Sequence, residues 1–442
     1  MTAQPSINFS ELDFNEEFVA AFDALENTKQ HLFVTGKAGT GKSTLLQYFH
    51  HKTTKNMAVL APTGVAALNV KGQTIHSFFQ FKPDITPEAV GDIIVRKRKR
   101  KLYAALDAVV IDEISMVRAD LFDCVDRFLR LYGPDCHHPF GGVQMIFFGD
   151  LFQLPPVVSK AETEIFQSFY ATPYFFSAKV FEEISLKMLE LKKIYRQKDE
   201  NFIHLLNALR HNQLQAHHFH AFNSRHLSDG HRVDTQEFCI TLTTTNVTAQ
   251  AANQKHLQNL PDREHVYQGA IAGEFDRRNL PTAEVLSLKK GAQVMFLNND
   301  TDKRWVNGTL GVIEGIIPKE QEEDIVFVKL EDGKTVDVKK YTWEIYQYYF
   351  DEVSLSLASK VIGYFTQYPL KLAWAVTIHK SQGQTFDRVV IDVGQGTFAH
   401  GQMYAALSRC RSLAGITLKR PLNRSHVLMD QRIVEFMTAC TA

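Results

Sequence analysis

Short apolar runs alternate with helix-forming stretches over the first third of the chain. The runs at 31–35 and 57–61 each lead through a glycine-containing loop into a stretch with helical spacing. Two more runs, at 107–111 and 143–148, are followed by Asp112-Glu113 and by Gly149-Asp150. Apolar strands that alternate with helices are typical of a parallel sheet covered on both faces. We therefore expect the polar residues after these strands to line a ligand site at one edge of that sheet.

The same alternation returns in the second half of the chain and is interrupted once. Residues 239–242 and 389–393 are strand-like runs followed by helix-forming stretches. From about 291 to 360 the pattern changes to short alternating runs separated by turn signals. The turn signals are Asn307-Gly308 and Asp332-Gly333. This pattern predicts an α/β fold with two parallel-sheet lobes and a small β-barrel inserted into the second lobe.

Composition excludes several classes of protein. A chain of 442 residues holds about three domains at roughly 150 residues each. Its 45% hydrophobic and 22% charged residues exclude a disordered chain. The sequence contains no apolar run long enough for a transmembrane helix, and its acidic N-terminus lacks the apolar core of a signal peptide.

Cysteine usage and charge narrow the classes further. The five cysteines are scattered without a CxxC, which argues against a disulfide scaffold or zinc module and predicts a reducing, cytoplasmic environment. Lysine plus arginine (49) equals aspartate plus glutamate (49), so any nucleic-acid contact is expected to be local. One charge run, RKRKRK at 96–101, is either a solvated run beside a strand or a phosphate-contacting loop.

The segment from Gly36 to Ser43 (GKAGTGKS) carries the most specific chemical signal. It matches the phosphate-loop pattern GxxxxGK[ST] and lies between a predicted strand and a predicted helix. Its glycines let backbone N–H groups converge on phosphates, and the helix N-terminus adds positive potential. Lys42 is expected to contact the β- and γ-phosphates and Ser43 to ligate Mg²⁺, so the expected cofactors are ATP and Mg²⁺. The expected nucleotide-binding residues here are Gly36, Gly39, Thr40, Gly41, Lys42, Ser43 and Thr44.

Two later strand ends supply groups that phosphate hydrolysis requires. Asp112 and Glu113 follow a buried strand, and beside a phosphate loop Asp112 suits the metal ion and Glu113 a general base. Gln153 follows the fourth strand, where its amide can hydrogen-bond the attacking water and the γ-phosphate. Pro155-Pro156 restrict that loop, which favours a positioned side chain.

Taken in order, these motifs resemble those of superfamily-one, group-B DNA helicases, and more closely the PIF-type (petite integration frequency) family. They extend from Gly36 to Arg411, over most of the chain. The motifs are GKAGTGKS, APTGVAALNVKGQTIHSFF, VVIDEISMV, GGVQMIFFGDLFQLPP, IYRQ, LTTTNVTAQAAN, LKKGAQVM, LAWAVTIHKSQGQTFD and YAALSRCR. The segment 116–133 resembles the signature that separates this family from other helicases of the group.

The resemblance implies an ATP-dependent 5′-to-3′ helicase of the bacterial minimal-core type, which translocates on single-stranded DNA and unwinds duplexes. Single-strand–duplex junctions, forks, RNA–DNA hybrids and G-quadruplexes are the implied substrates, and we expect a monomer with no membrane partner. Residues 1–185 would form a RecA-like lobe with a small wedge insert at about 73–85. Residues 186–295 and 361–442 would form the second RecA-like lobe, with an SH3-like β insert at 296–360.

Some catalytic roles come from the resemblance alone. Arg196 in IYRQ and Arg409 in YAALSRCR would stabilise charge on the transferred phosphoryl group. Gly383 would meet the γ-phosphate through its backbone, with Gln384 beside it. Helicases of this superfamily often read adenine with a glutamine, but the matching position here is Phe18, which we expect in the core.

A single strand is expected to be held by polar groups that track its backbone and by aromatic stacking. The phosphate-contacting candidates at a helix start are Pro62, Thr63 and Gly64. His76 and Phe78 are candidate stackers or wedges, with core positions as the alternative. In the second lobe the resemblance places Thr244, Asn246, Thr377, His379 and Lys380 along the DNA.

Two other interpretations of the motifs stay open from sequence. One is a RecD- or relaxase-like translocase that works within a larger complex, against which the segment 116–133 argues. The other is a P-loop ATPase that gates binding or signalling, which needs neither DNA-tracking motifs nor an arginine in a second lobe. Strand separation by the isolated chain, and stimulation of its ATPase by an oligonucleotide, distinguish the three.

Overall fold

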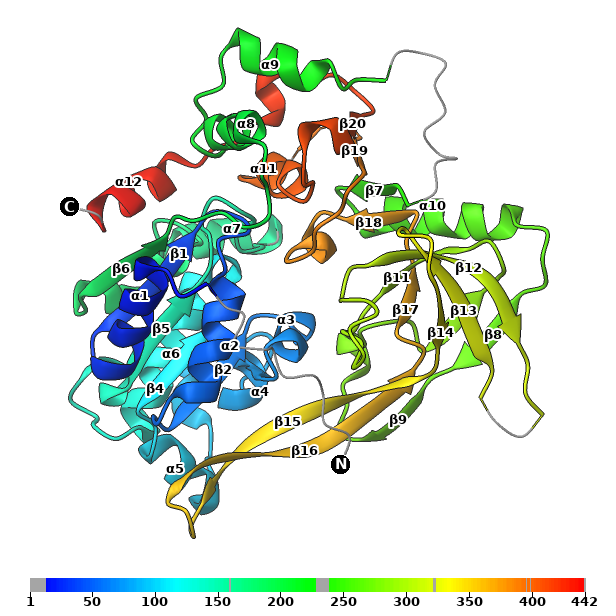
Figure 1. The fold of residues 1–442 in the computed structure, drawn as a ribbon. Helices are drawn as coiled ribbons and strands as arrows, with labels where there is room; N and C mark the ends of the chain where they lie inside the picture. Colours follow the sequence, from blue (N-terminus) through cyan, green and yellow to red (C-terminus); the bar gives the residue numbers. More distant parts are fainter. Residues whose placement is uncertain are drawn as a thin grey trace.

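A six-stranded parallel sheet forms the centre of the first lobe (Figure 1). A computed structural model describes residues 13–158, 160–227, 238–320, 323–394, 396–397 and 399–440. The strand order is β3-β2-β4-β5-β1-β6, and every neighbouring pair is parallel. The strands are β1 (His31–Gly36), β2 (Met57–Ala61), β3 (Gln73–Thr74), β4 (Ala108–Ile111), β5 (Gln144–Phe148) and β6 (Leu186–Leu191).

The central strands are continuous apolar runs because both of their faces are buried. Along β1, Leu32 and Val34 belong to one buried cluster, whereas Phe33 between them belongs to another. Leu45 of α2 joins the first cluster and Phe122 of α6 joins the second, so helices cover both faces. The helices of this lobe are α1 (Glu16–Asn27), α2 (Lys42–Lys52), α3 (Gly64–Asn69), α4 (Ile75–Phe79), α5 (Lys97–Ala104), α6 (Ala119–Tyr132) and α7 (Lys160–Gln167). The expected parallel α/β architecture is confirmed.

The first sheet extends beyond residue 185, where the sequence placed the end of the lobe. Strand β6 pairs with β1 along its whole length, from Leu186 to Leu191. This pairing joins segments that are far apart in the chain, so no local change in composition marks it.

The second lobe contains a four-stranded parallel sheet in the order β18-β7-β19-β20. Its strands are β7 (Ile240–Thr243), β18 (Ala375–Thr377), β19 (Val389–Asp392) and β20 (Ile416–Leu418). The helices after β6 are α8 (Glu200–Arg210), α9 (Ala216–Asn223), α10 (Asn246–Asn259), α11 (Gln402–Leu407) and α12 (Gln431–Ala439). Helix α12 returns to the first lobe, where Phe436 stacks on Phe176 with ring centroids 4.2 Å apart.

Between β7 and β18 the chain forms antiparallel sheets that lie to the right of the first lobe in Figure 1. Five strands follow the order β14-β13-β12-β11-β17, and two smaller sheets are β15-β16-β9 and β10-β8. The strands are β8 (His265–Gln268), β9 (Ala270–Gly273), β10 (Val285–Leu288), β11 (Gln293–Phe296), β12 (Leu310–Ile317), β13 (Ile325–Leu330), β14 (Thr335–Val338), β15 (Tyr341–Asp351), β16 (Ser356–Gln367) and β17 (Leu370–Leu372). These sheets therefore use more of the chain than the expected range 296–360.

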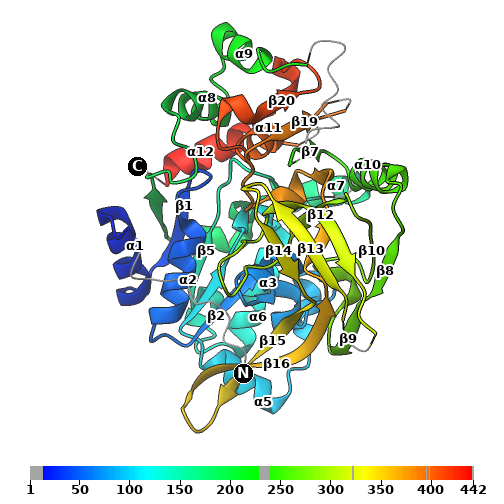
Figure 2. The same ribbon diagram turned by 45° about the vertical axis from the view of Figure 1, so that its right-hand side comes forward.

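The hairpin of β15 and β16 forms a long arm that reaches back to the first lobe in both views (Figures 1 and 2). The Tyr348 hydroxyl accepts a hydrogen bond from Val59 N at 3.1 Å, and Tyr348 N donates to Gln73 Oε1 at 3.2 Å. Nearer the tip, Leu357 N donates to Asn56 Oδ1 at 2.9 Å. The arm thus binds the first lobe near the edge of its sheet by polar contacts, of which those of Tyr348 are buried.

The helices described in the structure are all too short or too polar to cross a lipid bilayer.

Candidate active site

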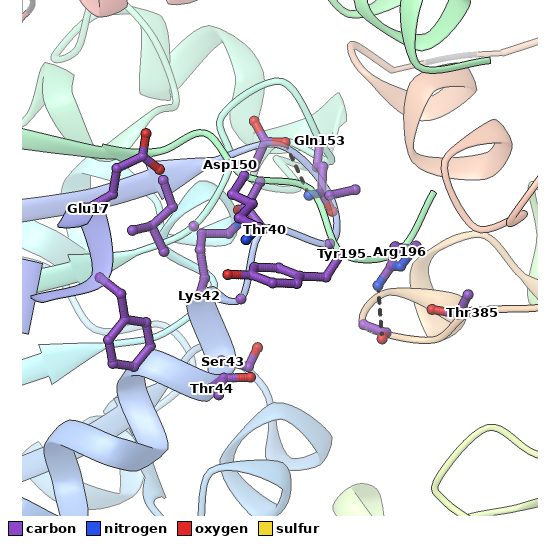
Figure 3. Close-up of a pocket in the computed structure, with 18 of the residues that line it drawn as sticks. Glu17, Thr40, Lys42, Ser43, Thr44, Asp150, Gln153, Tyr195, Arg196 and Thr385 are labelled. Atoms are coloured by element: carbon purple, nitrogen blue, oxygen red, sulfur yellow. Dashed lines mark hydrogen bonds between the residues drawn. The ribbon is translucent and has the colours of Figure 1, made fainter. Parts of the chain in front are cut away.

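A cavity of about 650 Å³ lies between the carboxyl edge of the first sheet and the second lobe (Figure 3). Most of the nucleotide and catalytic residues expected from sequence line it. These are Gly39, Thr40, Gly41, Lys42, Ser43, Thr44, Asp112, Glu113, Gln153, Arg196, Gly383 and Arg409. Gly36 and Gln384 do not line the cavity: Gly36 lies below it at the end of β1, and Gln384 packs near Gly308 of the insert.

The loop between β1 and α2 holds Lys42 in place. Lys42 Nζ donates to the carbonyl oxygens of Gly36 and Lys37 at 2.6 and 3.0 Å. Gly39 has a φ of 82°, and a Cβ there would lie 2.4 Å from Arg196 Cβ, so this position requires glycine. Burial lowers the pKa of Lys42, although nearby carboxylates oppose that shift. An ammonium that is poorly solvated and aimed into a cavity favours a negatively charged ligand.

Asp112 and Glu113 follow β4 at the cavity wall. Burial raises the pKa of both carboxyls, and the charge of Glu113 raises that of Asp112 further. Glu113 has a φ of 51°, in the left-handed region that non-glycine residues seldom adopt. Buried carboxyls and a strained backbone are both concentrated at functional sites, and here they coincide.

Gln153 is held by a neighbouring residue that sequence reasoning did not select. Its Nε2 donates to Asp150 Oδ2 at 3.2 Å, and Asp150 Oδ1 accepts from Arg210 Nη2 at 3.0 Å. Both charged side chains are almost fully buried, at 3% and 0% exposed for Arg210 and Asp150. Burial works against ionisation of Asp150, but Arg210 and Lys42 outweigh it and lower its pKa. The Arg210 guanidinium also lies 4.1 Å from the centroid of the Phe152 ring.

We expect replacement of Arg210 by methionine to cost roughly 3–5 kcal/mol of stability, because it leaves the buried Asp150 carboxylate without its partner. Urea denaturation measures this loss. Arg432→Met is the matched control, since Arg432 pairs with Asp430 at the surface (49% exposed) and is expected to cost less than about 1 kcal/mol. Adding Asp150→Asn to Arg210→Met should recover part of the loss. Equal losses in Arg210→Met and Arg432→Met would contradict the role assigned to the buried pair.

Two arginines approach the cavity from different parts of the chain. Arg196, after β6, donates to the carbonyl oxygens of Ser408 and Gly383 at 3.3 Å each. Arg409, after α11, is 1% exposed and donates to Ala405 O at 2.9 Å. Burial lowers the pKa of Arg196 to about 9, with a contribution from the charge of Arg409. Such a site favours an anion between the two guanidinium groups.

At the far wall of the cavity, Tyr195 and residues before α1 form a polar rim. Tyr195 Oη donates to Asp13 Oδ2 and accepts from Asn15 Nδ2, both at 3.0 Å, and Lys193 pairs with Asp13. The Tyr195 ring, labelled in Figure 3, lies against the phosphate loop, since a Cβ at Gly41 would lie 3.8 Å from Tyr195 Cε2. Phe18 lines the same wall but is 7% exposed and packs edge-to-face on Phe14, as expected of a core residue.

Several cavity residues were not selected from the sequence, although some of them lie inside the motifs quoted above. They are Asp13, Asn15, Glu17, Ala38, Gly149, Asp150, Leu191, Lys193, Tyr195, Thr385 and Arg411. Asp150 follows a buried strand just as Asp112 does. The quoted motifs also contain Ala38, Gly149, Tyr195, Thr385 and Arg411. The remaining residues lie outside those motifs and are brought to the cavity by chain folding: Asp13, Asn15, Glu17, Leu191 and Lys193.

The candidate strand-contacting residues of the first lobe lie at the ends of β2 and β3. Thr63 is exposed and caps α3 by accepting a hydrogen bond from Ala66 N at 3.3 Å. Pro62 is half-buried, and Gly64 is buried against Asn279 of the insert, so close that a Cβ would lie 2.4 Å from Asn279 Cγ. The exposed threonine is the part of this group that is open to a ligand.

The aromatic candidate Phe78 lies in the core. It is 2% exposed and packs edge-to-face with Phe79, Tyr103 and Tyr348, at centroid distances of 4.9, 5.4 and 5.9 Å. It is therefore placed to brace α4 and not to stack on a base. His76, half-buried on the same short helix, has a pKa lowered by burial.

In the second lobe the candidates meet at the carboxyl ends of two neighbouring strands. Thr377 of β18 pairs with Thr243 of β7 in the parallel register, so the segments that follow both strands lie side by side. Thr377 is buried and its hydroxyl accepts from Lys380 N at 3.3 Å. The other candidates are Thr244 and His379, which are half-buried, and Asn246 and Lys380, which are exposed.

The chain matches a family model described as PIF1-like helicase over residues 14–219. It is 32% identical to the ATP-dependent DNA helicase Pif1 of Bdellovibrio bacteriovorus, with 96% of this chain and 92% of that protein covered. It is 34% identical to human ATP-dependent DNA helicase PIF1 over 92% of this chain, and spans 61% of the human protein.

Solved structures of Bacteroides Pif1 are similar over nearly the whole chain. The complex with ADP-AlF4 has a TM-score of 0.88 at 36% identity, with 98% of each chain covered. The structure of Bacteroides Pif1 bound to single-stranded DNA has a TM-score of 0.69 at 36% identity, with 97% of each chain covered.

Proposed function

The chain belongs to the PIF1-like helicase family and is an ATP-dependent DNA helicase, and from this premise we propose that it moves 5′ to 3′ along single-stranded DNA by opening and closing its two lobes. The observation that carries this proposal is the convergence of both lobes on one cavity. The phosphate loop, Glu113 and Gln153 come from the first lobe, whereas Gly383 and Arg409 come from the second. Hydrolysis there is sensitive to the separation of the lobes.

We propose that ATP binds in this cavity with its phosphates on the loop between β1 and α2. Lys42, at the start of α2, faces the β- and γ-phosphates, while the helix N-terminus supplies N–H groups. The base lies toward Tyr195, whose ring offers a stacking surface that does not require a glutamine at Phe18.

Ser43 and Asp112 fit a magnesium ion, because both are oxygen donors on the wall of the same cavity and Asp112 is a buried carboxyl in need of a counter-charge. A bound Mg²⁺ would neutralise charge on the phosphates. Glu113 would take the proton of the attacking water, and Gln153 would orient that water while Asp150 holds its amide.

Lobe closure is linked to chemistry by hydrogen bonds that cross between the lobes. Arg196 donates to Ser408 O and Gly383 O, and Ala38 N of the phosphate loop donates to the Tyr404 hydroxyl at 3.3 Å. An ATP molecule between these groups would pull the lobes together, and release of phosphate would let them separate. Alternating grips at Thr63 and at Asn246 would then advance the strand.

The strand path requires the insert to move away from the first lobe. Asn279 covers Gly64, and Asn307 Nδ2 lies 3.4 Å from Asn69 Oδ1, so the insert closes over both ends of α3. The Bacteroides structures support a rearrangement, because similarity to this chain is lower with bound single-stranded DNA (TM-score 0.69) than in the unliganded protein (0.87).

We propose forks, other single-strand–duplex junctions, RNA–DNA hybrids and G-quadruplexes as substrates, with a monomer as the unit that moves. A solved structure of two Pif1 helicases at forked duplex DNA supports the fork as a substrate class. The five cysteines are free, which agrees with work in a reducing compartment such as the cytoplasm.

Strand separation on duplexes with a 5′ tail and with a 3′ tail tests the polarity. We expect the isolated chain with ATP and Mg²⁺ to separate the 5′-tailed duplex and to leave the 3′-tailed duplex paired. Separation of the 3′-tailed duplex alone would overturn the polarity, and no separation of either would point to a translocase that needs a partner.

A further inference from the structure

Helix α5 carries the charge run at 96–101, and the site described above uses none of it. The run forms a helix that begins at Lys97, instead of the loop considered from sequence. Five of its six cations are exposed, and none lines the nucleotide cavity. The exposed cations are Arg96, Lys97, Arg98, Arg100 and Lys101.

The positive charges of the run destabilise the helix that contains them. Lys97 and Lys101 are one turn apart, where like charges repel, and the first turn of α5 holds no acidic residue. Cations beside a helix N-terminus also oppose the helix dipole. The helix forms because Leu102 and Tyr103 are buried and Tyr103 Oη donates to Phe78 O at 2.6 Å. Residues that destabilise their own local structure are found mainly at functional sites, so this charge run is a candidate for one.

Within the described part of the chain, only one of these cations forms an ion pair with a carboxylate. Lys101 Nζ lies 2.7 Å from Glu352 Oε1, at the tip of the β15–β16 arm. Arg100 packs instead, since its Nε donates to Val95 O at 3.2 Å and its guanidinium lies 5.3 Å from the Tyr132 ring centroid. Three adjacent cations, at 96–98, are exposed and form no ion pair among the described residues, on a protein with no net charge. The charge of Arg98 adds to that of Lys101 in lowering the pKa of Glu352.

The position of α5 relates these charges to strand separation. The helix lies at the end of the first lobe away from the second lobe in both views (Figures 1 and 2). Tyr103 packs on Phe78 of α4 at 90° with centroids 5.4 Å apart, so α5 braces the segment 73–85 that we expect to act as a wedge. A duplex that meets this wedge would pass beside the three cations.

The residues around the run indicate which of three anionic partners it fits: single-stranded DNA, a membrane or duplex DNA. A single-strand site uses exposed aromatic rings for stacking, but Tyr103 is fully buried and the described residues 86–104 expose no aromatic side chain. A membrane-binding helix needs an apolar face of its own, but the apolar residues of α5, Leu102 and Tyr103, are buried in the core. The large exposed apolar residues nearby, Ile94 before the helix and Val353 and Leu355 at the tip of the arm, lie outside α5. Phosphates of a duplex backbone need neither feature.

We propose that α5 binds the duplex arm of a DNA junction through its phosphates, ahead of the point of strand separation and without reading bases. Duplex DNA carries one charge per about 1.7 Å, so several phosphates come within reach of a helix about 12 Å long. Binding would relieve the repulsion within α5 and release counterions from the DNA. This inference rests on the proposed helicase function.

The test compares a single-stranded oligothymidylate with the same strand carried as the 5′ tail of a duplex, by fluorescence anisotropy over a range of salt. For the variant Arg96→Gln/Lys97→Gln/Arg98→Gln we expect about tenfold weaker binding of the tailed duplex and a salt slope lower by about 2–3. Binding of the single strand, and the ATPase activity that it stimulates, should stay within about twofold of wild type. The single substitution Arg98→Gln should shift the tailed-duplex affinity in the same direction by a smaller factor.

Lys29→Gln/Lys52→Gln/Lys187→Gln is the matched control, because it removes the same charge from exposed positions elsewhere on the first lobe. Equal weakening by both triple variants, equal loss on both DNA probes, or unchanged affinity for the tailed duplex would each overturn the inference. So would binding of phosphatidylserine vesicles that the α5 variant abolishes while its duplex affinity is retained. Wild-type protein without DNA-stimulated ATP hydrolysis would instead refute the proposed function itself.

Discussion

Replacement of Lys42 by alanine is expected to abolish DNA-stimulated ATP hydrolysis while the protein stays folded. The ammonium group is held by the carbonyl oxygens of Gly36 and Lys37 and faces the cavity. Without it, the β- and γ-phosphates lose the lysine that neutralises them during transfer, and the buried carboxylates Glu113 and Asp150 repel them. We expect a loss of at least two orders of magnitude in kcat, on the scale of groups that stabilise transition-state charge.

Lys55→Ala is the matched control for this loss. Lys55 Nζ also donates to partly buried acceptors in the first lobe, namely Leu25 O, Thr28 O and Gln144 Oε1, but it does not line the cavity. Its replacement is expected to lower stability and to leave hydrolysis per folded molecule nearly unchanged. If Lys42→Ala hydrolysed ATP at the wild-type rate, the assignment of the phosphate site would be wrong.

Replacement of Arg409 by glutamine is expected to lower kcat by about 10³-fold or more, because an arginine that stabilises phosphoryl-transfer charge contributes 10³–10⁵ in rate. Ala405 O and Ser408 Oγ hold the guanidinium at the cavity wall, so its geometry is set before ATP arrives. Binding of ADP, measured by titration calorimetry, should change much less than kcat, because the charge that Arg409 stabilises develops during transfer.

Arg411→Gln is the control for Arg409→Gln, because both arginines line the cavity. Arg411 lines the cavity but is 59% exposed and pairs with Asp387 at 2.8 Å, so we expect less than about a tenfold loss. Weaker ADP binding with an unchanged kcat in Arg409→Gln would show that this arginine binds the ground state and does not act in the transition state.

The parts of the site that could be predicted from sequence are those whose residues are neighbours in the chain. Local geometry alone places the loop, the helix start and the lysine of the segment Gly36 to Ser43. Asp112-Glu113 follows a strand whose sequence is a continuous apolar run, because both faces of that strand are buried. The parallel sheet edge then brings these segments together, since strand carboxyl ends share one side of such a sheet.

The predictions that the structure changed concern pairings between distant segments. The partner of Asp150 is Arg210 on α8, and neither residue type nor spacing marks that arginine in the sequence. From sequence, Phe78 was a candidate stacking ring with a core position as the alternative, and packing against Tyr348 of the inserted arm places it in the core. The expected range 296–360 likewise left out β8 to β10, most of β11 and β17, because chain folding, and not the local alternation, pairs β9 with β16 and β17 with β11.

The family, the phosphate loop and the acidic pair were therefore predictable from the sequence, because short-range backbone geometry and chain order are enough to specify them. Tertiary structure decided which long side chains reach the cavity, which aromatic rings are buried and where the charge of α5 is directed. Such outcomes depend on burial and on contacts between residues more than a hundred positions apart, as in Arg196 with Ser408 or Val59 with Tyr348. The sequence pattern does not specify which distant residues come into contact, so only the folded chain shows how its two lobes share one site.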